Sequence, residues 1–313
     1  MTVYTCTMNL AIDLFIDTQE MKASTVNRTL SSDIQANGKG VNVSLIMKKF
    51  GLDTTALGFS AGFTGNYIAD YLHEHSISTK FIEVAGFTRI NVFTKVRSSN
   101  QEYKLVNSGP EVSMDHQNQL LQLIRTFKPN DYLIVSGSLP RGVEPSILLE
   151  IAKLCHENQV HLVLDVSHPI ILECLQYHPY LIKPNEEELA SWFNEKKAMT
   201  FKQIIQAGQE LLTQGAEHVL ISLGAEGAVY FASNHEIYAS NAPKGEVVNT
   251  ACSGDAMLGT FLANQLNGSD TEYCLKKAVA VGSSTAFSPG LSNLEDIADL
   301  EKQIHIRKLE EVS

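Results

Sequence analysis

The segment NTACSGDAM, residues 249–257, places three residues that could act on a phosphate group just ahead of an apolar stretch. Small residues such as Ser253 and Gly254 at a helix start leave backbone N–H groups available to an anion. Asp255 follows them and could accept a proton from an attacking hydroxyl group. A purely structural explanation also exists, because an acidic residue in the first turn stabilises a helix through its macrodipole. The other motifs have to decide between the two.

A second glycine-rich segment, ANGKGVNVS, puts Gly38 and Lys39 at the head of a predicted helix. A lysine beside such a helix start is a good anion receptor, although a solvated lysine there is the more ordinary interpretation. Asn42 faces the same end of the helix and could hydrogen-bond a hydroxyl group. This is not a Walker A loop, because the spacing G-x-x-x-x-G-K-[ST] does not occur in the chain.

Polar or glycine-rich motifs also lie at the ends of predicted strands. SGSLPRG closes an apolar strand with Ser138, which either contacts a ligand or belongs to an ordinary turn. SLGAEGA, residues 222–228, is either a glycine turn or exposed backbone against which a nucleotide lies. Arg89 begins a strand in TRINV; its guanidinium group suits phosphate recognition, although a lone arginine at this position is usually solvated.

The motif IKPNEEEL ends a strand in Lys183 and begins a helix. Asn185 and Glu188 have the spacing of a capping box, which explains the pattern without any function. The same amide and carboxylate could hold the water shell of Mg²⁺, which prefers few protein ligands and phosphate oxygens. The motif therefore predicts a helix start, a metal site, or both.

The elements that would position these motifs indicate an α/β fold. Apolar strands alternate with helical patterns in the second half of the chain: strands at 131–137, 160–166 and 218–224, and helices near 144–158, 186–193 and 200–214. This alternation predicts a doubly wound, mostly parallel sheet flanked by helices. Segments 12–35 and 80–107 look antiparallel and predict a small separate sheet. Ligands of such folds bind beyond the carboxyl ends of the strands, so the motifs should gather there.

Composition excludes several classes of protein. The chain has 313 residues, 44% of them hydrophobic and 19% charged, as in an ordinary globular protein. Its net charge of -11 argues against a nucleic-acid or anionic-membrane surface. No apolar run approaches the roughly 20 residues needed to span a bilayer. The N-terminal MTVYTCTMNL predicts a first strand, not a signal peptide. Five scattered cysteines without a CxxC pair favour a reducing cytoplasm over a disulfide framework or zinc site.

The order of the motifs resembles that of the ribokinase-like carbohydrate kinases, also called the phosphofructokinase B family. Asp13, GKGVN, TR, SGSLP, KPNEEEL, SLGAEGA and CSGDA follow one another over roughly residues 1 to 300. TMNLAID, GKGVNVS, TRINV, SGSLPRG and TAFSPGL are most similar to the branch of 1-phosphofructokinases and tagatose-6-phosphate kinases. The resemblance implies one domain spanning residues 1–313, with a small β lid that closes over the sugar and often mediates homodimerisation.

The resemblance also implies a role for each motif in a kinase that uses ATP and Mg²⁺. Asp255 would accept the proton, and the loop of Cys252, Ser253 and Gly254 would stabilise the transferred phosphoryl group. The implied sugar-phosphate ligands are Asp13, Gly38, Lys39, Asn42, Arg89 and Ser138. The residues implied to contact ATP are Lys183, Asn185, Ser222, Gly224, Gly227 and Ser283. Asn185 and Glu188 would organise Mg²⁺ through water.

Three residues depart from the family pattern: Leu10 replaces a usual proline, and Asn37 and Cys252 replace usual glycines. Asparagine tolerates positive φ better than most residues. Cys252 adds a Cβ atom where backbone must approach a phosphate. Its place beside a helix N-terminus also predicts a reactive thiol with a lowered pKa.

We expect an ATP-dependent kinase that converts fructose 1-phosphate to fructose 1,6-bisphosphate. One alternative is a kinase that converts tagatose 6-phosphate to tagatose 1,6-bisphosphate. The other, suggested by Cys252, is a weakly active regulator that binds a sugar phosphate. A nucleoside kinase is disfavoured, because Lys39 and Arg89 would meet no anionic group on its substrate.

Overall fold

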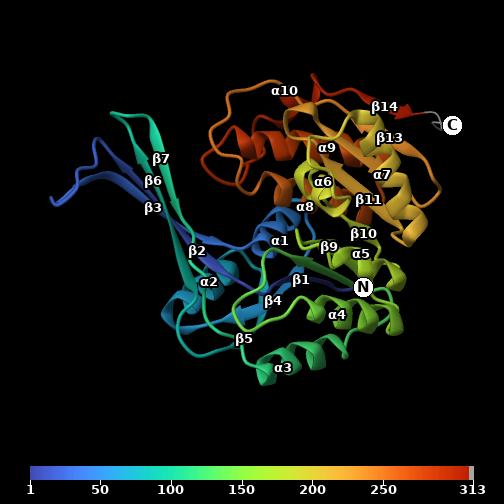
Figure 1. The fold of residues 1–313 in the computed structure, drawn as a ribbon, viewed down its shortest axis with the longest axis horizontal. Coiled ribbons are helices and arrows are strands. Elements are labelled where there is room, and N and C mark those ends of the chain that lie inside the picture. Colours follow the sequence, from blue (N-terminus) through green and yellow to red (C-terminus); the bar gives the residue numbers. More distant parts are fainter. Residues whose placement is uncertain (310–313) are drawn as a thin grey trace.

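The computed structural model describes residues 1–309 as two β-sheets, with helices on both faces of the larger one (Figure 1). The pairings from β5 to β11 are parallel, and the strands after β11 pair antiparallel. In spatial order the ten strands are β14 (Ile306–Leu309), β13 (Ile237–Ser240), β12 (Ala228–Phe231), β11 (His218–Ser222), β10 (Leu181–Ile182), β9 (His161–Asp165), β8 (Tyr132–Ser136), β1 (Val3–Thr7), β4 (Thr54–Ser60) and β5 (Ser78–Glu83). The predicted doubly wound, mostly parallel sheet is confirmed.

Strand composition accounts for this arrangement. The five residues of β8, YLIVS, are all buried, because a central parallel strand is covered by helices on both faces. The strands predicted at 131–137, 160–166 and 218–224 are confirmed as β8, β9 and β11. The predicted helices are confirmed as α4 (Ser146–Glu157), α6 (Glu186–Trp192) and α7 (Phe201–Gln214).

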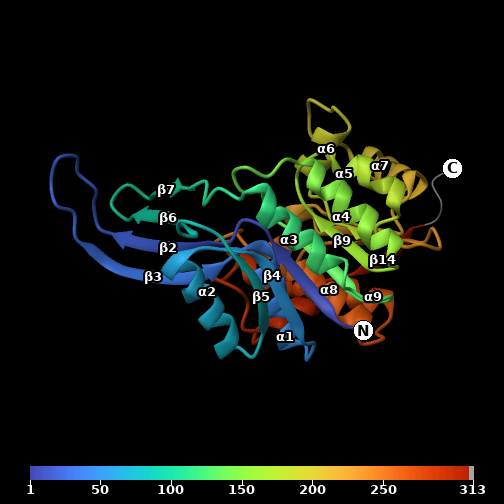
Figure 2. The ribbon, with the colours of Figure 1, turned by 90° about the horizontal axis from the view of Figure 1, so that it is seen from below.

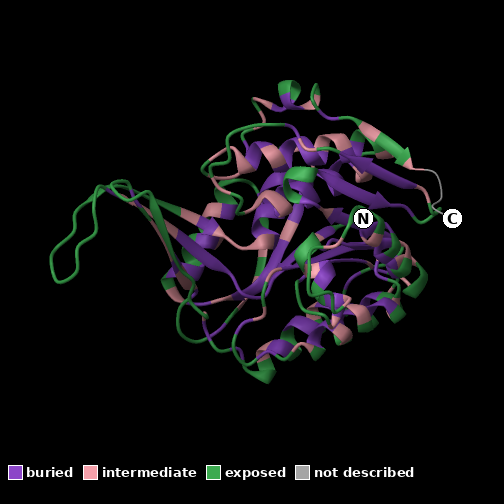
Figure 3. Cartoon of the chain, turned by 45° about the horizontal axis from the view of Figure 1, so that its top comes forward, coloured by how far each residue is buried: buried purple, intermediate pink, exposed green. Residues whose placement is uncertain are grey.

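The remaining helices complete two layers around the sheet (Figure 2). α3 (Met114–Ile124) and α5 (Ile171–Cys174) join α4, α6 and α7 on one face, over a core that includes Leu120 and Ile204. The other face carries α1 (Lys39–Lys49), α8 (Ser253–Leu266), α9 (Thr271–Ala286) and α10 (Ile297–Glu301), and α2 (Gly62–Glu74) covers the base of the smaller sheet. Burial is continuous through the strands and the helix faces that meet them (Figure 3). Among residues 1–309, no helix is long and apolar enough to cross a membrane.

The smaller sheet projects from the body of the molecule (Figure 1). Its strands, in order, are β3 (Thr29–Asn37), β2 (Ala11–Thr18), β6 (Arg89–Val96) and β7 (Gln101–Leu105). Ala11 pairs with both Asn37 and Arg89, so the base of this sheet collects polar residues from three separate segments. The expected segment 80–107 begins too early, because Lys80–Glu83 belongs to β5. Residues of β5, an edge strand of the large sheet, alternate between exposed and half-buried positions, as residues of the smaller sheet also do. The sequence pattern of 80–83 therefore did not distinguish the two sheets.

Candidate active site

The carboxyl ends of the parallel strands and the start of α8 meet at one edge of the large sheet. Asp255, in the first turn of α8, is buried, and its Oδ2 accepts a hydrogen bond of 2.8 Å from Asn42 Nδ2. Cys252 occupies the N-cap position of this helix, and its side chain makes no capping hydrogen bond. The first N–H groups of a helix have no partner within the helix, so this end of α8 can receive an anion next to a carboxylate.

Two lysines lie at this helix start and share one buried carboxylate. Asp165, the last residue of β9, is 3.0 Å from Lys183 Nζ and 3.6 Å from Lys39 Nζ. A Cβ atom on residue 254 would lie 3.2 Å from Lys183 Nζ, so Gly254 allows the ammonium group to approach the helix. Asp165 is not among the residues predicted from the sequence. Its signal was an acidic residue that ends the apolar run VHLVLD, at the edge where ligands were expected.

Burial and the neighbouring charges shift the pKa values of Asp165, Lys39 and Asp255. Burial alone would raise the pKa of Asp165, but the attraction of Lys183 and Lys39 lowers it. The Asp165 carboxylate in turn raises the pKa of Lys39. Burial, and then the repulsion of Asp165, raise the pKa of Asp255 to about 6. Asp255 is therefore ionised at neutral pH, yet closer to accepting a proton than an ordinary aspartate.

This raised pKa predicts the pH dependence of turnover. A general base must be ionised, so kcat/KM should fall about tenfold per pH unit below about pH 6, where Asp255 is protonated. The measurement is kcat/KM for the sugar phosphate between pH 4.5 and 8, with both substrates varied. An acidic limb near pH 4, the range of an unperturbed aspartate, would contradict the role of Asp255 as the base.

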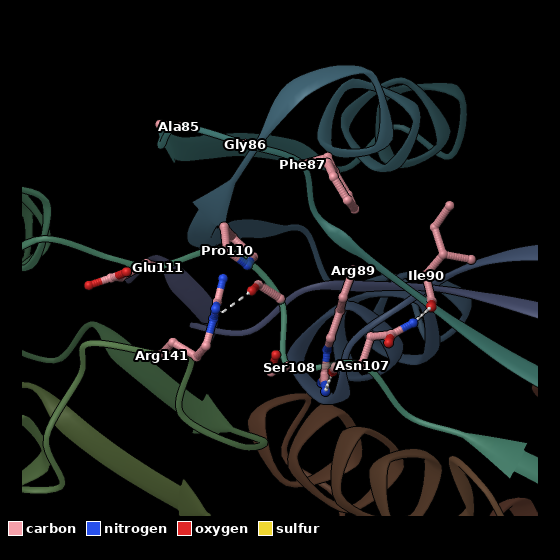
Figure 4. Close-up of a pocket in the computed structure, with 11 residues that line it drawn as sticks. Ala85, Gly86, Phe87, Arg89, Ile90, Asn107, Ser108, Pro110, Glu111 and Arg141 are labelled. Carbon is pink, nitrogen blue, oxygen red and sulfur yellow. Dashed lines mark hydrogen bonds between the residues drawn. The ribbon is translucent and has the colours of Figure 1, made fainter.

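A second group of polar residues lies at the base of the smaller sheet. The Arg89 guanidinium donates to the carbonyl oxygens of Asn107 at 3.0 Å and Asn9 at 3.1 Å, and approaches Ser138 Oγ at 3.5 Å. It borders a cavity of about 620 Å³ that Arg141 enters from the opposite side (Figure 4). The structure therefore brings Arg89 and Ser138 together, and Arg89 itself borders a space that could hold a phosphate group.

Asp13 lies between these two groups and is itself buried. Its Oδ1 accepts a hydrogen bond of 2.8 Å from Asn91 Nδ2, and its Oδ2 accepts one from Asn37 Nδ2. Burial raises the pKa of Asp13, although these hydrogen bonds and the charge of Arg89 oppose the shift. A buried carboxylate with ordered amide donors is suited to hold hydroxyl groups in a fixed orientation.

Comparison with known proteins decides the class of the site. The sequence matches the pfkB family of carbohydrate kinases over residues 4–298. The chain belongs to this family. It is 48% identical to a D-tagatose-1-phosphate kinase of Bacillus licheniformis over 98% of this chain and 100% of that protein. It is 32% identical to a 1-phosphofructokinase of Bacillus subtilis, again over 98% and 100% of the two chains.

The fold comparison agrees with this family assignment. Phosphofructokinase-2 of Escherichia coli superposes with a TM-score of 0.87 over 96% of this chain and 99% of the other, at 24% identity. The chain is thus a sugar-phosphate kinase of the pfkB family, with ATP as the donor that the family implies. The large sheet and the small projecting sheet together make the ribokinase-like fold predicted from the sequence.

Lys39 occupies a different place in this pfkB kinase from the one that the resemblance implied. Its stem passes Gly137, the neighbour of Ser138, but its ammonium group pairs with Asp165 on the side of Lys183 and Asp255. Gly38, just before it, has φ +146°, and a Cβ atom there would lie 2.7 Å from Thr7 Cγ2. Gly38 therefore serves close packing of α1 on β1, which places Lys39 between the two ends of the site.

Of the residues implied to bind ATP and Mg²⁺, Asn185, Glu188 and Ser222 lie together at the start of α6. Asn185 and Glu188 form the capping box of α6. The Glu188 backbone N–H donates to Asn185 Oδ1 at 2.7 Å, and the Asn185 backbone N–H donates to Glu188 Oε2 at 2.9 Å. The Glu188 charge still acts on Lys39, so this carboxylate borders the lysine cluster. Ser222 pairs with Asn185 through a β-bridge. The structural and the functional interpretation of KPNEEEL are therefore compatible.

The other three residues implied to contact ATP differ in what the structure assigns to them. Gly224, at φ +53°, has open space around it, as a residue that contacts a nucleotide needs. Gly227 is fixed by packing instead, because a Cβ atom there would lie 2.0 Å from the Ser240 carbonyl oxygen. Ser283 follows Gly282, which packs against the Ser253 carbonyl at the start of α8.

The structure contradicts the expectation that Cys252 has a reactive thiol with a lowered pKa. Burial, followed by the charges of Asp255 and Asp13, raises the pKa of Cys252 instead of lowering it. Its sulfur lies 3.1 Å from Asn42 Nδ2, among groups that already bind the two carboxylates. The favourable field of a helix N-terminus is outweighed here, because a thiolate would be a third negative charge in a half-buried pocket. The residue keeps the left-handed conformation, with φ +65°, that a glycine would adopt more easily.

Proposed function

We propose that this pfkB kinase transfers the γ-phosphoryl group of ATP to the 6-hydroxyl of a ketohexose 1-phosphate. We infer that D-tagatose 1-phosphate is preferred over D-fructose 1-phosphate, the substrate expected from the sequence. The observation that carries the reaction is Asp255, buried at the α8 N-terminus beside Lys183. The choice of substrate is supported by two relatives that are named for sugar 1-phosphates. The D-tagatose-1-phosphate kinase is 48% identical to this chain, and the 1-phosphofructokinase is 32% identical.

The geometry supports a direct transfer. Ionised Asp255 accepts the proton of the 6-hydroxyl while O6 attacks the γ-phosphorus atom. The new O6–P bond forms as the bond from phosphorus to the β,γ-bridging oxygen breaks, and its electron pair leaves with ADP. The N–H groups at the start of α8 and the ammonium group of Lys183 face the charge that spreads over the phosphoryl oxygens. The reaction needs no covalent intermediate on the protein.

We assign the binding and orientation of the sugar phosphate to the end of the site opposite Asp255. Arg89 and Ser138 would hold the 1-phosphate, and Asp13 would accept hydrogen bonds from the ring hydroxyl groups. Lys39 lies between the two phosphates, where its charge can serve either the sugar phosphate or the transferred group. The sugar would thus extend from Arg89 to Asp255, with its phosphate and acceptor hydroxyl at opposite ends.

Mg²⁺ is proposed to lie at the start of α6. Among residues 1–309 no group of three His, Cys, Asp or Glu side chains could hold a metal directly, so binding through water fits best. Asn185 and Glu188 each use one oxygen in the capping box, which leaves the second Glu188 oxygen to bind a metal-coordinated water. When bound, Mg²⁺ would neutralise charge on the ATP phosphates.

The test is an ADP-release assay with D-tagatose 1-phosphate, D-fructose 1-phosphate, D-tagatose 6-phosphate and D-fructose 6-phosphate. We expect turnover of both 1-phosphates, with the higher kcat/KM for D-tagatose 1-phosphate. Turnover of D-tagatose 6-phosphate alone would favour transfer to O1 and contradict the proposal. Tight binding of a sugar phosphate without turnover of any would favour the regulator suggested by Cys252.

We also infer that two copies associate through the smaller sheet, in a reducing compartment. Apolar side chains on its strands are exposed: Leu30 by 54%, Ile34 by 52% and Leu105 by 63%. A patch of this kind on a projecting sheet is typical of an association surface. A monomeric mass in analytical ultracentrifugation at micromolar concentration would exclude this association.

A further inference from the structure

The side chain of Asn37, the last residue of β3, connects the two carboxylates of the site. Its Nδ2 donates to Asp13, and its Oδ1 accepts a hydrogen bond of 2.8 Å from Asn42 Nδ2. Asn42 Nδ2 also donates to Asp255 Oδ2 at 2.8 Å. A series of hydrogen bonds therefore runs from Asp13, on the smaller sheet, through two amides to Asp255.

The orientation of this amide is fixed by its neighbours. The Asn37 Oδ1 atom accepts from Gly38 N at 2.6 Å as well as from Asn42, which occupies both of its lone pairs. A flipped amide would put a carbonyl oxygen against the Asp13 carboxylate and an NH₂ group against two donors. The NH₂ group has two protons, and only one is needed for Asp13.

Among residues 1–309, the second N–H of Asn37 has only a weak acceptor nearby. Cys252 Sγ lies 4.0 Å from Asn37 Nδ2, at the limit of a contact with sulfur. A thiol sulfur is a poor acceptor, so an oxygen from a ligand would replace it with a gain in hydrogen bonding. Asn37 is thus a half-buried, oriented donor beside the path from Asp13 to Asp255.

The chemistry of the sugar shows what this donor would meet, given the proposed function. If Asp13 holds ring hydroxyl groups and Asp255 receives the proton of O6, the carbons C5 and C4 lie between them. C4 is the carbon at which D-tagatose and D-fructose differ in configuration. The two epimers place the C4 hydroxyl group on opposite faces of the ring, so only one of them could present it to Asn37.

We propose that Asn37 is a specificity-determining residue, whose second N–H binds the C4 hydroxyl of D-tagatose 1-phosphate and not that of D-fructose 1-phosphate. The proposal rests on the proposed function, because it needs the acceptor to be O6. One hydrogen bond made by one epimer only corresponds to a preference of about fivefold or more.

The experiment compares kcat/KM for the two 1-phosphates in the wild type and in Asn37→Ala. We expect the ratio of D-tagatose 1-phosphate to D-fructose 1-phosphate to fall about fivefold or more. Asn91→Ala is the matched control, since it removes the other amide that donates to Asp13, at 2.8 Å, but has no assigned contact with C4. It should lower kcat for both sugars by a similar factor and leave the ratio unchanged.

The outcomes separate this inference from the function on which it rests. An unchanged ratio in an active Asn37→Ala enzyme would overturn the inference alone and reduce Asn37 to a positioning residue for Asp13. A wild type that uses only 6-phosphates would overturn both, because the acceptor would be O1, remote from C4. Should Asn37→Ala fail to fold, Asn37→Ser provides the same comparison with a shorter side chain.

Discussion

Replacement of Asp255 by asparagine should lower kcat by about 10²- to 10⁴-fold, the contribution of a general base. The substitution keeps the shape of the side chain and its bond from Asn42, but removes the ability to accept a proton. KM for ATP should change little, because Asp255 faces the acceptor hydroxyl. The measurement is steady-state kinetics with saturating ATP and a varied ketohexose 1-phosphate.

Stability provides the control for this variant. The folded-state pKa of about 6 lies above the value of about 3.9 for an unperturbed aspartate, so the ionised carboxylate destabilises the folded state at pH 7. Asp255→Asn should therefore unfold at no lower temperature than the wild type. Asp270→Asn, at the start of α9, alters a comparable helix-start carboxylate outside the site and should leave kcat unchanged. Near-normal kcat in Asp255→Asn would mean that the residue serves only the helix macrodipole.

Replacement of Arg89 by alanine should weaken binding of the sugar 1-phosphate by about 1.5–3 kcal/mol, the range for hydrogen bonds to charged groups. This corresponds to an increase in Kd of about 10- to 100-fold. The guanidinium is half-buried beside Ser138, and burial lowers its pKa, so a phosphate group there would restore favourable electrostatics. ATP affinity should remain within about twofold, as measured by isothermal titration with each ligand alone.

Arg97 is the matched control, because it directly follows β6, the strand of the smaller sheet that Arg89 begins. It is exposed and paired with Asp17 at 2.9 Å, away from Ser138. Arg97→Ala should leave both affinities unchanged, since exposed ion pairs contribute little. A parallel loss of ATP and sugar-phosphate affinity in Arg89→Ala would contradict the division of the site into two ends.

The fold and the edge of the sheet that carries the site were predictable from local patterns. Apolar runs such as VHLVLDV that alternate with helical patterns are typical of buried parallel strands, and the carboxyl ends of such strands lie at one edge of the sheet. The glycine-rich motif before Asp255 likewise marks a helix start in any tertiary context. The order of the motifs therefore carried most of the functional prediction.

The interactions within the site were less accessible to the sequence. Asn37 and Cys252 are 215 residues apart, and their contact depends on how the smaller sheet meets α8. The prediction of a lowered pKa for the Cys252 thiol rested on the local field of the helix N-terminus. It did not include the two carboxylates that distant parts of the chain bring close to the sulfur atom. Asp165 was missed because its importance comes from Lys39 and Lys183, which reach it from two other segments.

The pairing of Ala11 with both Asn37 and Arg89 joins β2, β3 and β6, so Asp13, Asn37 and Arg89 share the smaller sheet, whereas Asp255 lies in α8 on the large sheet. Any rotation of the smaller sheet would therefore carry these three side chains together toward or away from Asp255. ATP bound without a sugar would then lie in a site that is only partly assembled. A water molecule that entered this site would not be positioned by the Asp13 carboxylate. We therefore expect the two-sheet construction to limit hydrolysis of ATP when no sugar phosphate is bound.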